Sequence, residues 1–473
     1  MIEFGTDGIR GIANKELTAE VALLAGKCIA YQMSVVPGSE ASVACGASVA
    51  CGARRIMVAK DTRVSGDMLE GALIAGICSM GIDVWKIGVT PTPCLAFLTR
   101  ATGCDAGIMI SASHNPVEDN GIKVFSPEAY KLEEKTERAI EKLLNAPGRA
   151  RFPRPAGAEV GQVTDRKATT RRYVAAVRRV LDGVSLPGRF VVDCANGATA
   201  RFAKRVFRDR VGELIVVNGE EDGRQINVDC GSTRPEKLAK KVVRSGARLG
   251  FAFDGDGDRA IFVDERGSVV DGDQIMLLCA RFLKKKRKLK HNTVVATVMS
   301  NMGFEEALSE GGMKMLRTPV GDKYVLQEML RGGYSIGGEQ SGHIIFLDHS
   351  TTGDGLLTAA FVLKVVSESG RRFSELTRMR RSGQILKNVR VPDKKAFEAS
   401  RKIKAEIRKV EKKLEGKGRL VVRPSGTEPK IRVMAEAWDA GLAAWAVDHL
   451  IGVVNEELGG GKQAGSPKAG RRR

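Results

Sequence analysis

Apolar and polar residues follow two different periods along the first 90 residues. Apolar positions recur every three or four residues over 19–33 and 66–80, which predicts two amphipathic helices. Residues 55–60 and 82–87 are short apolar runs of the kind found in buried strands. Strands that alternate with helices predict a layered α/β domain.

The same alternation returns along the rest of the chain. Helices are predicted at 169–181 and 272–284, and strands at 190–193, 260–263 and 293–297. From about residue 380 the order changes, with strands at 386–391, 420–422 and 431–434 and helices at 395–415 and 440–458. We therefore predict three similar α/β units followed by a smaller α+β unit.

These patterns predict four domains and a tail. The domains are 1–155, 156–253, 254–372 and 373–458, and a disordered basic tail is expected at 459–473. A hexapeptide at 42–47 is repeated unchanged at 48–53, which is too short for a repeat architecture. It is interpreted as a loop insertion without a function of its own.

The chain of 473 residues carries a formal charge of +20, a field that attracts phosphates and nucleic acids alike. Two segments concentrate this charge, 284–290 and 459–473. Neither has interleaved aromatic residues, and aromatic content is 5%, so they are interpreted as solvated surface. A nucleic-acid partner is not predicted, although a nucleic-acid-binding protein stays the alternative outside the enzymes.

The chain shows no membrane or secretion signal. Its first residues are charged and lack the apolar region of a signal peptide, and no later stretch reaches the length of a membrane span. Nine cysteines, an odd number without a C-x-x-C pair, are expected to be reduced thiols. We therefore expect a cytoplasmic protein.

Residues 251–259 place three carboxylates, Asp254, Asp256 and Asp258, directly after an apolar strand. Gly255 and Gly257 separate them and are expected to turn the backbone through positive φ, so that the carboxylates converge. Oxygen ligands of this kind suit Mg²⁺ or Ca²⁺. A solvated acidic turn is the alternative, and an EF-hand is excluded because no Glu stands at the twelfth loop position.

A second polar loop, 111–116, follows the apolar run 107–110 and carries Ser111, Ser113 and His114. Open α/β sheets place ligands at such strand ends. No Gly-x-Ser-x-Gly elbow surrounds Ser113, so a serine hydrolase is not indicated. Either Ser113 is functional or this loop is only a turn before Pro116.

Two further loops carry polar groups. Residues 337–343 offer Glu339, Gln340, Ser341 and His343, a set that suits the hydroxyls of a sugar unless it is only a polar hairpin turn. The other loop, near the C-terminus, has the composition of an anion nest. Its cations and small residues are Arg423, Ser425, Gly426, Thr427 and Arg432. The predicted metal site, Ser113, the sugar-binding loop and the anion nest lie in four different predicted units. They can form a single site only if the units meet around a central cleft. Together they describe phosphoryl transfer on a phosphosugar.

With these motifs in order, the chain resembles the α-D-phosphohexomutase superfamily, and within it the bacterial phosphoglucosamine mutases. The resemblance runs from residue 4 to about 436 and rests on 4–11, 110–116, 119–125, 254–259, 320–325, 338–343 and 351–355. Lys323 stands where these enzymes often have Arg. Phosphomannomutase/phosphoglucomutase is the alternative within the superfamily, and Gln340 argues against it.

The resemblance implies a reaction. Phosphorylated Ser113 would donate to glucosamine 6-phosphate, and the resulting glucosamine 1,6-bisphosphate would reorient and return its other phosphate, leaving glucosamine 1-phosphate. This product feeds UDP-N-acetylglucosamine and cell-wall precursor synthesis. The enzyme would be an isomerase-class phosphotransferase, and a homodimer is usual for the family.

The resemblance also implies roles for individual residues. One Mg²⁺ per subunit would be held by Asp254, Asp256 and Asp258 and by the phosphate on Ser113. Arg10, Lys123 and Arg259 would stabilise charge or assist proton movement, and His343 would be an acid or base, whereas His114 would orient its loop. Glu339, Gln340 and Ser341 would bind the sugar, and Arg423, Ser425, Gly426, Thr427 and Arg432 the phosphate that is not reacting.

Overall fold

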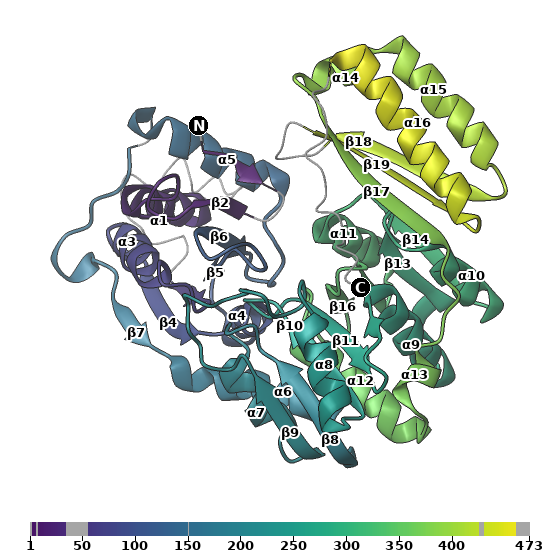
Figure 1. The fold of residues 1–473 in the computed structure, drawn as a ribbon. Helices are drawn as coiled ribbons and strands as arrows, with labels where there is room; N and C mark the ends of the chain where they lie inside the picture. Colours follow the sequence, from purple (N-terminus) through teal and green to yellow (C-terminus); the bar gives the residue numbers. More distant parts are fainter. Residues whose placement is uncertain (1, 6–7, 35–54, 150, 425–429, 460–473) are drawn as a thin grey trace, which may run out of the picture. The chain divides into compact units, whose positions relative to one another are not determined.

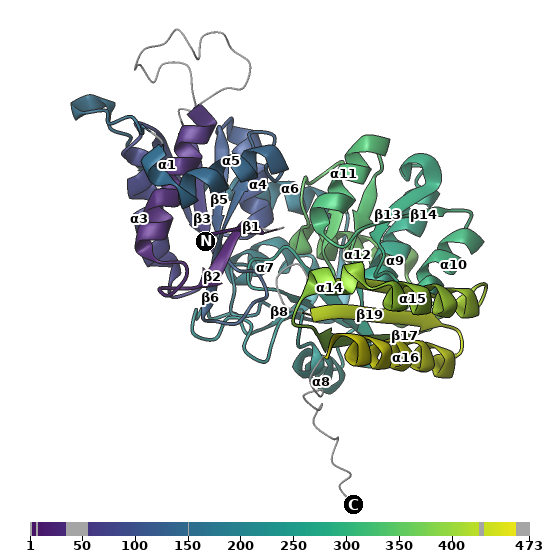
Figure 2. The same ribbon diagram turned by 90° about the horizontal axis from the view of Figure 1, so that it is seen from above.

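The computed structural model describes residues 2–5, 8–34, 55–149, 151–424 and 430–459 (Figures 1 and 2). Contacts divide the chain into two compact units. The first comprises Met1–Met299 and Gly312–Arg378, and the second Ser300–Gly311 and Met379–Arg473. The duplicated hexapeptide and the tail beyond Gly459 lie outside the described residues.

The first unit begins with a mixed seven-stranded sheet of order β1-β2-β6-β5-β3-β4-β7. Its strands are β1 (Phe4–Gly5), β2 (Gly8–Ile12), β3 (Arg55–Lys60), β4 (Asp83–Val89), β5 (Ala106–Ile110), β6 (Asp119–Phe125) and β7 (Val163–Asp165). Strands β3, β4, β5 and β7 are parallel, whereas β6 runs antiparallel to β5 and β2.

Helices cover both faces of this sheet because its central strands are apolar on both sides. α1 (Ala19–Ser34), α3 (Gly66–Cys78) and α5 (Glu134–Asn145) share one core with Ile56, Val58 and Ile108. α4 (Thr92–Thr102) packs on the other face, where Gly107 of β5 abuts Thr99 and Leu95.

Two further sheets complete the first unit. The second has the order β12-β11-β10-β8-β9, and the third β14-β13-β15-β16. Their strands are β8 (Leu186–Asp193), β9 (Val211–Val217), β10 (Leu249–Phe253), β11 (Ala260–Asp264), β12 (Val269–Val270), β13 (Thr293–Thr297), β14 (Lys314–Thr318), β15 (Ile336–Gly338) and β16 (Ile344–Phe346). The helices around them are α6 (Thr170–Val180), α7 (Ala200–Phe207), α8 (Glu236–Ser245), α9 (Gly272–Lys285), α11 (Asp322–Gly332), α12 (Gly355–Ser369) and α13 (Phe373–Leu376).

The second unit contains an antiparallel sheet of order β17-β19-β18, formed by β17 (Gly383–Arg390), β18 (Gly418–Pro424) and β19 (Lys430–Ala437). α14 (Lys394–Ala399), α15 (Arg401–Leu414) and α16 (Ala440–Leu458) pack on it through one apolar core (Figure 1). α10 (Met302–Glu310) joins this unit through Glu436, which accepts a hydrogen bond from the Met302 amide at 2.5 Å.

The predicted fold class is confirmed, since three mixed sheets with their helices precede a C-terminal α+β domain. One predicted helix is wrong in its extent. Residues 395–415 form two helices, because the Ser400 backbone is extended (φ −64°, ψ 117°) and its hydroxyl caps α15 by accepting from the Ile403 amide at 3.2 Å.

The sheets also differ from the predicted boundary at 253/254. β11 pairs with β10 over five residues, and β12 pairs with β11, so residues up to 270 belong to the second sheet. The Asp254–Asp258 loop therefore connects two strands of the second sheet and does not open the third domain. Likewise β7 joins the first sheet, past the predicted boundary at residue 155.

Seven cysteines lie within the described residues, and all seven are free and buried, as expected for reduced thiols. Cys45 and Cys51 lie outside the described residues. Among the helices that the structure describes, none combines the length and apolar character needed to cross a membrane.

Candidate active site

The three sheets of the first unit each contribute one loop of the same kind. The Ser113 loop connects β5 to β6, the Asp254–Asp258 loop connects β10 to β11, and the Glu339–His343 turn connects β15 to β16. In each case the first strand pairs in parallel with a neighbour, and the second returns antiparallel to it. The loops therefore sit at equivalent strand ends of three sheets.

Ser113 lies against the acidic loop. Its hydroxyl is buried and donates a hydrogen bond to Asp254 Oδ2 at 2.5 Å, which joins residues 141 positions apart. Its backbone has φ 52°, a left-handed conformation rare for a residue with a side chain. Such strain persists only where the surroundings impose it, and it occurs most often at functional positions.

Asp254, Asp256 and Asp258 form a buried cluster whose potential ligand oxygens lie within 4.8 Å of one another. Asp256 Oδ1 and Asp258 Oδ1 are buried, and neither accepts a hydrogen bond from any described residue. Buried carboxylate oxygens without donors are costly unless a cation meets them. The three residues thus fit a hard divalent cation, as the sequence predicted.

The two glycines of this loop serve different purposes. Gly257 has φ 71°, as predicted. Gly255 does not have a positive φ; there, a Cβ would lie 2.7 Å from the Ser113 carbonyl oxygen. Gly255 is thus needed because the two loops approach each other closely.

Cations balance the acidic cluster. Lys123 Nζ, buried on β6, lies 2.8 Å from Asp256 Oδ2 and 3.7 Å from Asp258 Oδ2. Arg259 Nε lies 3.7 Å from Asp258 Oδ1. Arg10 on β2 reaches the Ser113 loop, where its Nη1 donates to Asn115 Oδ1 at 3.3 Å. All three predicted cations thus surround the serine and the carboxylates.

The surroundings move the pKa values of two carboxylates in opposite directions. Burial and the neighbouring Asp258 and Asp256 raise the pKa of Asp254 well above its usual range. Burial also opposes ionisation of Asp258, but Lys123 and His343 outweigh it and hold the pKa of Asp258 well below its usual range.

The two histidines also differ. Burial, with the charge of Arg259, lowers the pKa of His114 to about 4, so this ring is neutral at pH 7. For His343 burial acts in the same direction, but Asp258 and Asp322 reverse it and raise the pKa. His343 Nδ1 lies 3.6 Å from Asp258 Oδ2, and its Nε2 accepts a hydrogen bond from the Gly353 amide at 3.0 Å.

Sequence reasoning missed the group that holds the Ser113 loop in place, Arg63. Its guanidinium is buried and donates to the carbonyls of Ser113 at 3.0 Å, Asn115 at 2.9 Å and Asp119 at 2.9 Å, and also to that of Pro116. Four carbonyls of one loop thus converge on one side chain.

Asp61 completes this support. It accepts from Arg63 Nε at 3.1 Å and from the Ser111 hydroxyl at 2.7 Å, and Ser111 in turn accepts from the Ser113 amide at 2.9 Å. The sequence did contain a signal for this support. Asp61 and Arg63 directly follow the apolar run 55–60, and charged residues at the end of a predicted strand indicate a functional position.

The predicted sugar-binding residues lie on a half-buried turn. Glu339 accepts from the Gly321 amide at 3.2 Å through Oε1 and from the Ser341 hydroxyl at 3.4 Å through Oε2. The Gln340 carbonyl accepts from the Gly272 amide at 3.0 Å, which anchors the turn to α9. Glu339 and Ser341 are thus adjacent and reachable by a ligand.

The predicted phosphate-binding loop belongs to the second unit. Arg423 on β18 and Arg432 on β19 are directly paired across the antiparallel ladder, so they share a face of the sheet. Ser425, Gly426 and Thr427 lie outside the described residues. Arg423 is the last but one residue of β18 and Arg432 the third residue of β19, the strands before and after that loop.

Family models match the chain in four consecutive parts. They describe phosphoglucomutase/phosphomannomutase alpha/beta/alpha domain I over residues 1–150, domain II over 171–267, domain III over 271–381 and the C-terminal domain over 386–449. A solved structure of a phosphoglucomutase/phosphomannomutase family protein from Burkholderia thailandensis matches 97% of this chain and 98% of its own, with a TM-score of 0.77 and 24% identity. It supports the fold alone.

Another solved structure, the Aspergillus fumigatus N-acetylphosphoglucosamine mutase in complex with GlcNAc-6P and magnesium, matches 97% of this chain and 96% of its own, with a TM-score of 0.67 and 19% identity. The curated relatives are more similar. Phosphoglucosamine mutase of Desulforamulus reducens is 49% identical over 453 residues, 95% of this chain and 98% of that protein. That of Geobacillus kaustophilus is 46% identical over 458 residues, 96% and 99% of the two chains. The chain therefore belongs to the phosphoglucosamine mutase family of the phosphohexomutases.

Proposed function

We infer that the protein interconverts glucosamine 6-phosphate and glucosamine 1-phosphate through a phosphoserine enzyme and glucosamine 1,6-bisphosphate. The observation that carries this assignment is the contact of the Ser113 hydroxyl with Asp254 inside a buried cluster of three carboxylates. A serine in this position can carry a phosphoryl group whose charge a divalent cation offsets.

We assign Mg²⁺ to Asp254, Asp256 and Asp258. Bound there, it supplies a Lewis acid that polarises the phosphoryl group on Ser113. The chain's own cations act beside it, because Lys123 and Arg259 face the same carboxylates at 2.8 to 3.7 Å. The transferring group, which carries negative charge on three oxygens, thus meets positive charge from several sides.

Each half-reaction moves one phosphoryl group. The bond from phosphorus to Ser113 Oγ breaks, a bond from phosphorus to a sugar hydroxyl oxygen forms, and the hydroxyl proton passes to a base. His343 is the candidate for that base, since its Nδ1 lies 3.6 Å from Asp258 of the carboxylate cluster, whereas Lys123 acts there as a cation. The return transfer restores phosphoserine and leaves the phosphate on the other sugar oxygen.

The remaining predicted residues bind the substrate in two poses. Glu339 and Ser341 hold sugar hydroxyls, with Gln340 positioning their turn, because adjacent acceptors and donors suit a polyol. Arg423 and Arg432, with the loop 425–427, hold the phosphate that is not reacting, since two arginines opposite each other on one face of the sheet suit a phosphate dianion.

The test is a coupled mutase assay with glucosamine 6-phosphate, Mg²⁺ and a trace of the 1,6-bisphosphate. We expect turnover by the wild type and a loss on the order of 10⁴-fold or more in Ser113→Ala. Ser126→Ala is the matched control, because this hydroxyl lies outside the proposed site and donates to Glu128 at 2.8 Å in an exposed turn. Turnover of glucose or mannose phosphates instead would replace the substrate, and no turnover of any of them would overturn the assignment.

The cytoplasmic location and the homodimer remain predictions. The location rests on the free, buried cysteines of the described residues, which suit a reducing compartment. Light scattering of the purified protein tests the dimer.

A further inference from the structure

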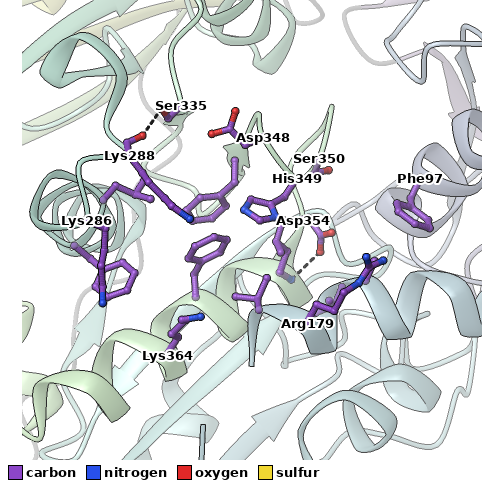
Figure 3. Close-up of a pocket in the computed structure, with 18 of the residues that line it drawn as sticks. Phe97, Arg179, Lys286, Lys288, Ser335, Asp348, His349, Ser350, Asp354 and Lys364 are labelled. Atoms are coloured by element: carbon purple, nitrogen blue, oxygen red, sulfur yellow. Dashed lines mark hydrogen bonds between the residues drawn. The ribbon is translucent and has the colours of Figure 1, made fainter. Parts of the chain in front are cut away.

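A cavity of about 950 Å³ lies in the first unit apart from the catalytic loops (Figure 3). It is bordered by α6, by α9 and the segment that follows it, by α12, and by the residues after β16. None of the described residues that line it belongs to the serine loop, the acidic loop or the sugar-binding turn. The proposed reaction therefore leaves this cavity without a role.

One wall of the cavity is aromatic. Phe346 and Phe361 stack with ring centroids 4.2 Å apart and planes 9° from parallel. His349 stands edge-on to Phe361 at 5.2 Å, and Figure 3 shows its ring beside Asp354. Phe97, Tyr173 and Phe282 also line the cavity. Phe346, Phe361 and Tyr173 are buried, so the rings open to a ligand are the half-buried Phe97 and Phe282 and the exposed His349. Such rings favour a planar ligand group.

The rim of the cavity is cationic. Six cations line it: Arg179, Lys286, Arg287, Lys288, Lys290 and Lys364. Lys286 pairs with Glu368 and Lys290 with Asp348, each at 2.7 Å. The other four form no ion pair with any residue that the structure describes. They come from α6, from the segment after α9 and from α12, so they converge from three elements and are not the solvated face of a single helix.

We propose that this cavity binds a nucleotide. The base lies against the aromatic wall, and the phosphates meet Arg179, Lys288 and Lys364, whose positive charge is not balanced by carboxylates. The volume is within the range of about 300–1,000 Å³ typical of small-molecule sites. A phosphosugar satisfies the cations but has no planar group for the wall, which is why a nucleotide fits better.

The cavity is connected to the catalytic loops through one short segment. Phe346 ends β16, which begins directly after His343. Asp354 lines the cavity, accepts from the Tyr173 hydroxyl at 2.8 Å, and follows Gly353, whose amide donates to His343 Nε2. A bound nucleotide therefore contacts the segment that holds His343. Resting on the proposed function, we expect nucleotide binding to change the mutase kcat.

The experiment is isothermal titration calorimetry of the full-length protein with UDP, ADP, GDP and CDP, with inorganic pyrophosphate as the probe without a base. We expect at least one nucleotide to bind, and the double variant Lys288→Glu/Lys364→Glu to weaken it about tenfold or more. Lys285→Glu is the matched control, because Lys285 is an exposed cation of α9 that does not line the cavity. Circular dichroism establishes that each variant is folded.

Three results would overturn the proposal. One is binding that the double variant leaves unchanged, and another is displacement of the nucleotide by glucose 1,6-bisphosphate, which would place it in the active site. The third is pyrophosphate binding as tightly as every nucleotide, which would mean that the aromatic wall contributes nothing. Because calorimetry does not need turnover, a failed mutase assay and a failed binding proposal are distinguished.

Discussion

At the scale of single residues, the site balances its charges before any ligand enters. Three buried carboxylates face Lys123, Arg259 and His343. The pKa of His343 is raised by its acidic neighbours. Asp254, which accepts from the Ser113 hydroxyl, is the carboxylate whose pKa is raised, by burial and by the neighbouring Asp258 and Asp256. Under the proposed function, the charge of a bound cation and that of a phosphoryl group on Ser113 would offset each other.

Arg63 provides the first prediction. Arg63→Lys keeps the charge but cannot donate to four carbonyls at once, so the Ser113 loop loses its fixed position. We expect kcat to fall about 10²-fold with little change in KM, since reacting groups tolerate little misplacement. Steady-state kinetics measures this. Arg189→Lys, which alters an exposed pair with Glu213, is the control, and a fully active Arg63→Lys enzyme would refute the positioning role.

Asp354 provides the second prediction, which concerns the pH dependence of stability. Burial raises its pKa from 3.8 to about 6, so the folded state holds a proton that the unfolded state has already lost. This contribution to stability is present below pH 3.8 and is lost as the pH rises through about 6.

Asp354→Asn keeps the oxygen that caps α12 and meets Tyr173, but it has no charge to bury. We expect the variant to be more stable than the wild type at pH 7, by up to about 3 kcal/mol, and to match it near pH 4. Urea unfolding at both pH values measures the difference. A constant difference at the two pH values would show that Asp354 titrates normally.

The residue scale also marks what sequence could predict. Asp254, Asp256 and Asp258 were found because their spacing is local and their chemistry is unusual. Arg63 was not, since its role depends on carbonyls about 50 to 56 positions away, and backbone groups carry no sequence signature. The difference lies in sequence separation, because periodicity and motifs report only on near neighbours.

At the scale of elements, α1 and α3 cross with their backbones nearly in contact. A Cβ on Gly26 would lie 2.3 Å from the Leu73 carbonyl oxygen, and one on Gly76 would lie 2.2 Å from that of Leu23. Each glycine thus makes room for the other helix. Gly71, on α3, has nothing within 4 Å of its Cβ position.

Gly76→Ala and Gly71→Ala form a matched pair of predictions. The first overpacks the crossing and should destabilise the first unit by about 1–3 kcal/mol. The second removes backbone entropy on an exposed surface and should stabilise it by about 0.5–1 kcal/mol. Thermal and urea unfolding measure both. Equal effects from the two substitutions would mean that α1 and α3 do not pack in this way.

Element boundaries were predicted less well than element types. The division at Ser400 was missed because the apolar period continues across it, and only the backbone dihedrals and the cap reveal the break. The placement of β11 and β12 in the second sheet was missed for another reason. Strands that pair can be far apart in the sequence, and the apolar pattern of one strand does not predict which strand it pairs with.

At the scale of the whole molecule, the proposed function assigns a role in substrate binding to residues of the second unit. Arg423→Gln removes one of two arginines that lie opposite each other on β18 and β19 of the second unit, far in sequence from Ser113. We expect KM for glucosamine 6-phosphate to rise about tenfold or more while the phosphoserine content, measured by mass spectrometry, stays unchanged. Arg390→Gln, an exposed cation of the same sheet, is the control. An unchanged KM would remove the second unit from substrate binding.

The use of one loop type in three sheets has a consequence for evolution. Ser113, the three carboxylates and the Glu339–His343 turn, to which the proposed function gives the carrier, metal and sugar-binding roles, each occupy the same connection in a separate sheet. A substitution in one connection leaves the strands that support the other two intact. Under the proposed roles, a lineage can therefore change which sugar it accepts by altering the β15–β16 turn while it keeps the residues of phosphoryl transfer, so substrate and reaction can evolve separately.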